Sequence, residues 1–399
     1  MVDKKNTATA ENPREVTQAR TKGNSSASHL VTNHLPKWAP YAIVAGSVVA
    51  AIVATALISD GFSIALAAFL AGLFNLVVTF AWSAAVEGKR KAVDRVATVL
   101  VSSAFALALV PLISLLWMAI EKGGPVLIEN SSLLNRSMEG MKGIYDKEFA
   151  AGESELMGGF HHAIVGTLLI TLAAAIISIP IGVLCAIYLV EYANDKKSGA
   201  LGRAITFFVD VMTGIPSIVA GLFAFSLFST VIELVAPENL TAAKSGISAA
   251  VALSVLMIPV VVRNTEEILR LVPHDLREAS YALGVPKWKT IMKIVLPTAI
   301  SGILSGITIA IARVIGETAP IMVTAGFAAS VNWNVFSGWM STLPTFIYDS
   351  VTRPTAPGTA AIASTDRAWA AALVLIVIVM LLNLGARILS KLLAPKSGR

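Results

Sequence analysis

The chain has 399 residues, of which 55% are hydrophobic and only 14% are charged, so it carries too much apolar surface for a soluble protein of this length. The net charge of +6 does not indicate nucleic-acid binding, because the basic residues form short clusters beside apolar segments rather than one stripe. The single cysteine, Cys185, excludes an intrachain disulfide and a thiolate metal site, and the five histidines lack metal-ligand spacing. The composition therefore predicts an all-α polytopic membrane protein.

The N-terminal region begins with residues 1–38, which are polar and contain no apolar run; this predicts a disordered tail rather than a signal peptide. Two apolar stretches follow, residues 39–59 and 62–86, and each is long enough to cross a hydrocarbon layer of about 30 Å. Only Asp60 and Gly61 separate them, so they predict a tight transmembrane hairpin. A basic loop completes this accessory region, which we assign to residues 39–95.

Six further apolar segments predict a second group of membrane spans, at residues 96–120, 163–190, 207–232, 247–262, 298–326 and 369–388. The net acidic stretch 122–158 and the aromatic-rich stretch 328–366 are expected to lie outside the membrane on the external side. Eight spans place both chain ends on one side, and if that side is the cytosol, most of the 31 Lys and Arg residues lie inside. The tails, residues 1–38 and 394–399, are therefore expected to be cytosolic.

The segment between the sixth and seventh spans, residues 278–297, reads EASYALGVPKWKTIMKIVLP and predicts two short helices around a turn. A capping box of Asp275 and Glu278 is expected to begin the first helix. Gly284 is expected to end it, because a left-handed backbone costs glycine almost nothing. The spacing puts on one face of this helix Leu276, Ala279, Ser280 and Leu283.

The second short helix is expected to begin at Pro286, whose missing N–H is no loss in a first turn. Its predicted apolar stripe consists of Trp288, Ile291, Met292 and Val295. Pro297 is then expected to open the next membrane helix. The number of preceding spans places the whole segment in the cytosol. One interpretation of its pattern is an amphipathic helix that rests on the membrane surface.

At this segment the sequence resembles the permeases of ABC importers with the MetI-like fold. The residues that match their EAA signature are Glu278, Ala279, Ser280, Gly284, Ile294, Leu296 and Pro297. Ser280 departs from the alanine that is usual in the family. The resemblance implies a six-helix permease core over residues 96–393, in which a coupling loop, residues 264–297, docks on a separate ATPase subunit.

Three further stretches resemble the PstA-type permeases of phosphate importers: GIPSIVAGLF at residues 214–223, ARVIGETAP at 312–320 and STLPTFIYDSV at 341–351. The PstC-type paralogues share the coupling loop but typically lack the Thr-Ala-Pro ending. The resemblance implies a permease for inorganic phosphate in a bacterial plasma membrane. A permease for molybdate or sulfate and a PstC-type permease stay open as alternatives, and the first two spans lie outside the resemblance.

Arg313 and Glu317 are the only charged residues well inside a predicted span, where each costs about 3 kcal/mol at mid-bilayer. One helical turn separates them, so they can form a structural ion pair, although Arg before Glu is the poorer order. The alternative hypothesis is that Arg313 transiently meets a phosphate anion while Glu317 keeps the site from holding it too tightly.

The source of energy is expected to be a partner, because no GxxxxGK[ST] motif occurs in the sequence. The chain is therefore expected not to be an enzyme and to bind no cofactor, with ATP and magnesium bound by partner subunits. The resemblance implies a PstC-like permease subunit, two PstB-like ATPase subunits and an extracytoplasmic PstS-like phosphate-binding protein. Phosphate and membrane lipids complete the expected partners. A channel or receptor without an ATPase is the remaining alternative class.

Overall fold

The computed structural model describes residues 34–58, 63–193 and 199–393, and within these ranges the regular structure is entirely helical. Eight of the described helices are long and apolar enough to cross a membrane, which confirms the predicted eight spans. The C-terminal tail 394–399, most of the tail 1–38 and the turn at Asp60 and Gly61 lie outside the described residues. The chain divides into two compact units, Met1–Leu115 and Leu116–Arg399.

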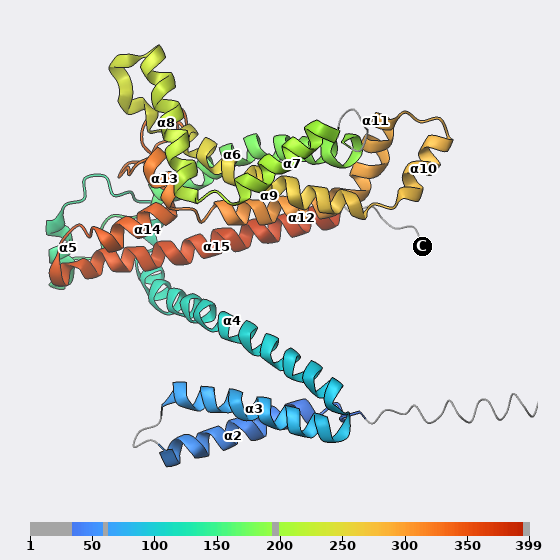
Figure 1. Cartoon of the computed structure of the whole chain (residues 1–399). Helices are drawn as coiled ribbons and strands as arrows, with labels where there is room; N and C mark the ends of the chain where they lie inside the picture. The colour runs from blue at the N-terminus through green and yellow to red at the C-terminus, as the bar shows by residue number, and fades with distance from the viewer. Residues whose placement is uncertain (1–33, 59–62, 194–198, 394–399) are drawn as a thin grey trace, which may run out of the picture. The chain divides into compact units, whose positions relative to one another are not determined.

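The first unit contains α2 (Ala39–Ile58) and α3 (Ile64–Val86), which pack against each other as the predicted hairpin (Figure 1). The predicted basic loop up to residue 95 is wrong in extent, because α4 (Lys89–Glu129) begins only three residues after α3 ends. Gly88, with φ of +91°, allows the sharp reversal between the two helices. The lysines and arginines that follow favour a helix, so they form the first turns of α4.

Glu87 joins three parts of this first unit. Its carboxylate accepts hydrogen bonds from the Leu35 N–H (2.8 Å), from the Ser83 hydroxyl (2.9 Å) and from both Nε and Nη2 of Arg95 (2.5 and 2.8 Å). The side chain of Glu87 is fully buried, whereas that of Arg95 is 33% exposed. The hydrogen bonds from Arg95 are the main reason that the pKa of Glu87 falls to about 2. Glu87 therefore binds α3, α4 and the chain before α2 to one another.

The second unit is built around α9 (Gly246–Leu271), which packs against α6 (His161–Ile187), α8 (Ser217–Val235) and α12 (Leu296–Val314). Helices α6 and α9 lie so close together that a Cβ at Gly182 would be 2.6 Å from a Val261 methyl group. The core here contains mostly small and branched apolar side chains from α6, α9, α12 and α13, with Met257 of α9 among them. Close packing of small residues is typical of helices that associate within a membrane.

Two predicted spans of the second unit have the wrong bounds. Residues 207–213 belong to a separate helix, α7 (Gly199–Thr213), and the chain breaks at residues 214–216 before α8 begins. Pro216 explains the break, because a proline disfavours a helical backbone in the residue before it and cannot donate a helix hydrogen bond. The predicted span 298–326 likewise ends at Val314, and a second short helix, α13 (Ala319–Thr324), follows.

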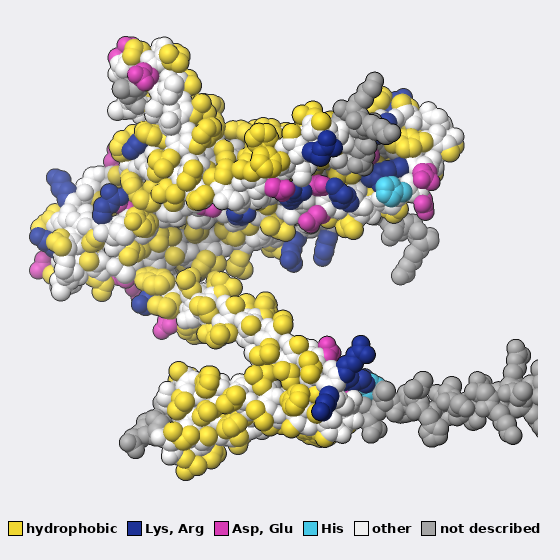
Figure 2. Space-filling view, in the orientation of Figure 1, with side chains coloured by type: hydrophobic (Ala, Val, Ile, Leu, Met, Phe, Trp, Pro, Cys, Tyr) yellow, Lys and Arg dark blue, Asp and Glu magenta, His cyan; other side chains and the backbone are white. Residues whose placement is uncertain are grey.

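The ends of the second unit contain additional helices. The predicted external segments are partly helical: 122–158 contains the end of α4 and α5 (Gly143–Ala150), and 328–366 contains α14 (Leu343–Thr352) and the start of α15 (Ala361–Leu393). Within this unit α5 lies at one end, and α10 (His274–Ala282) and α11 (Lys287–Thr290) lie at the other (Figure 1). Lys and Arg side chains gather toward both ends and leave an apolar middle (Figure 2), as expected for a membrane-spanning protein.

Candidate functional site

The candidate coupling segment consists of α10, a turn and α11. The predicted start of this segment at residue 264 is wrong, because residues 264–271 continue α9. There Glu266 accepts hydrogen bonds from Arg263 (3.0 Å) and Arg270 (2.6 Å), and these i,i+3 and i,i+4 pairs favour a continued helix. The segment between the helices is therefore shorter and more tightly held than the sequence predicts.

The predicted cap at Asp275 is also wrong, whereas Pro297 lies in the first turn of α12, as predicted. Pro273 precedes α10 with an extended backbone, and Asp275 lies inside the first helical turn, where a negative charge is favourable at the positive end of the helix dipole. Pro297 lies within a continuous helical run, Lys287–Val314, that includes a π-helical turn, η5 (Ile291–Val295). The wider hydrogen-bonding pattern of a π-turn accommodates a proline that cannot donate to the preceding turn.

Gly284 makes the turn that the sequence predicts. Its φ is +74°, its N–H donates to the Tyr281 carbonyl (2.9 Å), and the Val285 N–H donates to the Ser280 carbonyl (3.2 Å). These two bonds form a Schellman motif with the glycine at the left-handed position. A Cβ at Gly284 would meet nothing within 4 Å, so the backbone conformation alone favours glycine here.

The buried face of α10 is polar: Arg277 and Ser280 are buried, whereas three residues of the predicted apolar face, Leu276, Ala279 and Leu283, are exposed and only its fourth member, Ser280, is not. Arg277 donates to the Glu191 carboxylate (2.7 and 3.1 Å) and to the carbonyls of Leu269 (3.1 Å) and Val272 (2.7 Å). Ser280, the departure from the usual alanine, shares a 2.8 Å hydrogen bond with the Thr290 hydroxyl. Arg277, Glu191 and Thr290 are functional candidates that the sequence does not predict, because no local pattern indicates which distant side chain will meet a buried arginine.

The opposite face of the segment exposes apolar side chains. We define the outer face as six exposed residues of α10, the turn, α11 and η5, five of them apolar and one acidic. Leu283 is 83% exposed and Trp288 is 59% exposed. The outer face consists of Leu276, Glu278, Ala279, Leu283, Trp288 and Met292. An exposed apolar patch of this kind marks a surface that contacts another protein or the membrane surface.

The predicted stripe of the second short helix divides between these two faces. Ile291 and Val295 are buried, and Val295 belongs to a core cluster with residues of α9 and α12, whereas Trp288 and Met292 lie on the outer face. Of the other residues that match the EAA signature, Ile294 and Leu296 are half-buried and Pro297 is exposed. The signature therefore contributes to the outer face, to the turn and to the packing beneath it.

Arg313 and Glu317 lie on either side of the end of α12. Arg313 is exposed in the last helical turn, and Glu317 is half-buried in the connection to α13, where its N–H donates to the Val314 carbonyl (3.1 Å). Among the ion pairs of the described residues, none joins these two side chains. The helix ends between them, so their side chains do not have the one-turn spacing that a continuous helix would give.

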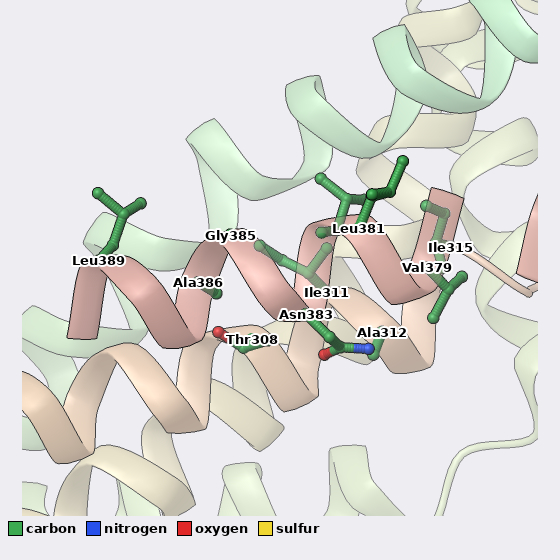
Figure 3. A pocket seen from close by; sticks show the side chains of 11 residues that line it. Thr308, Ile311, Ala312, Ile315, Val379, Leu381, Asn383, Gly385, Ala386 and Leu389 are labelled. Carbon is green, nitrogen blue, oxygen red and sulfur yellow. The ribbon is translucent and has the colours of Figure 1, made fainter. Parts of the chain in front are cut away.

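Two cavities lie near this part of α12. An apolar groove of about 280 Å³ separates α12 from α15, and Thr308 and Asn383 are its polar lining residues (Figure 3). A larger cavity of about 760 Å³ is lined by residues of α8, α13, α14 and α15, together with Gly316 and Thr318 beside Glu317. Neither lining contains a charged side chain. Neither cavity by itself therefore has the cationic groups that hold an oxyanion strongly.

Comparison with known proteins identifies the family. Residues 178–399 match the model of the "Binding-protein-dependent transport system inner membrane component" family. "Phosphate transport system permease protein PstA 1" of Mycobacterium tuberculosis (strain CDC 1551 / Oshkosh) is 44% identical over 298 residues, which cover 75% of this chain and 88% of the relative. "Phosphate transport system permease protein PstA" of Mycobacterium leprae (strain TN) is 43% identical over 296 residues, covering 74% and 88%.

A solved chain of the inward-facing MetNI methionine ABC transporter is 18% identical, with a TM-score of 0.44, and the match covers 59% of this chain and 94% of that chain. The family model covers more than half of the residues, and the PstA relatives match over most of their own length. The chain therefore belongs to the family of binding-protein-dependent transport system inner membrane components, with PstA permeases among its relatives.

Proposed function

We propose that this chain is the membrane-spanning permease subunit of an ATP-driven importer of inorganic phosphate in a bacterial plasma membrane. The observation that carries this proposal is the 44% identity to a phosphate transport permease over 88% of that relative's length. Eight helices able to cross a membrane and an exposed coupling segment support it. Both chain termini and the end that carries α10 and α11 lie in the cytosol under this proposal, in agreement with the distribution of Lys and Arg.

The outer face of the coupling segment is the docking surface for an ATPase subunit in this proposal. Leu283 and Trp288 supply apolar contact area, and Glu278 supplies a charge beside them. Apolar anchors at the centre of an interface and charges at its rim are typical of specific protein contacts. The remaining partners are a paralogous PstC-like permease subunit, a second ATPase subunit and an extracytoplasmic phosphate-binding protein.

The energy for transport comes from ATP and magnesium bound to the ATPase subunits, since the sequence of this chain contains no GxxxxGK[ST] motif. Closure of the ATPases on ATP moves the coupling segments and switches the membrane helices between outward and inward access. This chain performs no chemical step itself. Its contribution is to convert movement at the outer face into rearrangement of α6, α9 and α12.

Arg313 is a phosphate contact in the transport pathway under the same proposal. Its side chain is exposed near the end of α12, where the membrane makes an unused charge costly, and the described residues include no ion pair that occupies it. Glu317, half-buried one connection away, supplies a negative charge that favours release of the anion. A paralogous subunit that faces α12 would supply the rest of this site. The site has to bind phosphate weakly enough to release it, as every transport pathway must.

The test is uptake of radiolabelled phosphate by liposomes that contain the complete complex, with ATP inside and the binding protein outside. We expect ATP-dependent uptake that excess unlabelled phosphate abolishes and that molybdate and sulfate leave largely unchanged. Suppression by molybdate or sulfate alone would instead indicate the other oxyanion permeases. Purification without any nucleotide-binding partner would favour a channel or receptor.

A further inference from the structure

The contact between Arg277 and Glu191 joins elements that are far apart in the chain. The two side chains are 9% and 5% exposed, and Glu191 lies in a π-helical turn, η3 (Tyr188–Tyr192), that ends α6. The same guanidinium binds the carbonyls of Leu269 and Val272 at the end of α9. A buried charge pair in which each guanidinium nitrogen donates to a fixed acceptor holds its elements in one geometry. Arg277 therefore fixes α10 to the ends of both α6 and α9.

The other half of the coupling segment contacts the same turn of α6. The Lys287 ammonium lies 4.8 Å from the centre of the Tyr192 ring, a cation–π contact between α11 and η3. Adjacent residues of one turn, Glu191 and Tyr192, thus contact α10 and α11 respectively. π-helical turns are frequent at functional positions, because the wider turn redirects side chains that a regular helix would space differently.

The opposite end of α6 is bonded to a third region. The Thr167 hydroxyl accepts a 2.8 Å hydrogen bond from the N–H of Leu343, the first residue of α14, and donates to the Ala163 carbonyl (2.7 Å). Gly166 lies directly under the Ser341 carbonyl, which would be 2.1 Å from a Cβ at this position. Thr167 and Glu191 are 24 positions apart (191 − 167), or roughly 36 Å along a helix at about 1.5 Å per residue.

From these contacts, and resting on the proposed function, we propose that α6 is the mechanical tie between the coupling segment and α14. Glu191 is the positioning residue at one end of this tie, and Thr167 is the positioning residue at the other. Displacement of α10 by an ATPase pulls α6 through the Arg277–Glu191 pair, and α6 moves the start of α14 through Thr167. Neither residue touches ATP or phosphate.

The first experiment breaks the tie at Glu191 without touching the outer face. The complete complex is reconstituted in liposomes with its ATPase and binding-protein partners, and the ratio of phosphate imported to ATP hydrolysed is measured. Glu191→Gln keeps the size of the side chain and removes the charge that holds Arg277. We expect normal co-purification of the ATPase but a ratio lower by roughly fivefold or more, the lower end of typical coupling between sites.

Asp146→Asn is the matched control, because it breaks another buried ion pair far from the coupling segment. Asp146 pairs with Arg367 of α15 (2.6 Å), and their side chains are 1% and 0% exposed. We expect this control to lower the thermal stability of the complex without changing the ratio of phosphate to ATP. An equal loss of the ratio in both variants would overturn the proposal, because any broken buried pair would then suffice.

The second experiment breaks the other end of α6, so the proposal stays testable even if Glu191→Gln fails to assemble. Thr167→Val removes the hydroxyl that accepts the Leu343 N–H, and Thr167→Ser keeps it. We expect a lowered ratio in the valine variant and the wild-type ratio in the serine variant. Equal ratios in these two variants would overturn the tie. If the wild-type complex imports no phosphate, the proposed function fails instead, and that result is distinguishable from either outcome.

Discussion

At Gly284 a single backbone angle limits which residues can be substituted. With φ of +74° and open space around its Cα, the residue has room for a side chain but a conformation that disfavours one. We predict that Gly284→Val strains the turn by about 1–2 kcal/mol and reduces ATPase co-purification, while membrane insertion is unchanged. Gly284→Asn is the control, because asparagine tolerates the left-handed region and should retain more binding. Normal co-purification of the valine variant would contradict this prediction.

Arg313 is the residue at which transport and packing can be separated. Because the structure shows no ion pair between it and Glu317, Arg313→Gln should leave no buried partner without a counter-charge. We predict that this variant, alone or with Glu317→Gln, assembles with its ATPase but takes up phosphate at least about tenfold more slowly. That magnitude corresponds to the loss of one hydrogen bond to a charged group.

The measurement for Arg313 compares radiolabelled phosphate uptake with the amount of assembled complex in the membrane. Arg387→Gln is the matched control, since it removes another exposed arginine from a membrane helix, α15, and should leave uptake per complex unchanged. Wild-type uptake per assembled complex in the Arg313→Gln, Glu317→Gln double variant would show that neither charge contacts phosphate.

At the scale of elements, the hairpin α2–α3 is held to the start of α4 by Glu87. We predict that Glu87→Gln destabilises this unit by roughly 1–3 kcal/mol, as expected for lost hydrogen bonds to a charged group. Because Arg95 is 33% exposed, the loss should be smaller than for a fully buried pair. The destabilisation is detected as a faster rate of limited proteolysis near Leu35. Asp94→Asn is the control, because Asp94 is an exposed carboxylate next to Arg95 in the same helix, α4.

The low pKa of Glu87 also determines how pH acts on this element. A carboxylate with a folded pKa of about 2 and an ordinary value of 4.5 stabilises the folded state fully above the ordinary value. That stabilisation is lost as pH falls from 4.5 towards 2. We therefore expect cleavage near Leu35 to be independent of pH between about 5 and 8 in the wild type and to increase below about 4. Increased cleavage already at pH 6 would contradict the low pKa of Glu87 as the origin of the pH dependence.

At the scale of the whole molecule, the division into two compact units predicts which part of the chain can be deleted without loss of transport. The hairpin lies in the first unit, whereas the coupling segment, Arg313 and all of the family match lie in the second. We predict that deletion of residues 1–86 leaves substantial phosphate uptake. Glu87 then loses its partners Leu35 and Ser83 but keeps Arg95. Complete loss of uptake from a truncated chain that inserts stably would show that the hairpin belongs to the transport machinery.

The sequence by itself determined the features that depend on local chemistry. Apolar runs of about 20 residues predict membrane helices, because the bilayer leaves the backbone few other ways to satisfy its hydrogen bonds, and eight such helices are confirmed. The turn at Gly284 was predictable for a similar reason, since a left-handed backbone position strongly favours glycine. Residues that match the EAA signature could be named because their spacing is itself a local pattern.

Only the tertiary structure decided which face of each helix is buried and where several helices end. Leu276 and Leu283 are exposed while Arg277 is buried, the reverse of what hydrophobicity predicts, because the guanidinium meets Glu191, 86 positions earlier in the chain. The continuous helix through Pro297 likewise depends on a π-helical turn whose residue Val295 packs in a cluster with residues of α9 and α12. Burial of a charge or a wider helical turn is stable only with distant partners, and a local pattern contains no information about which distant partners are present.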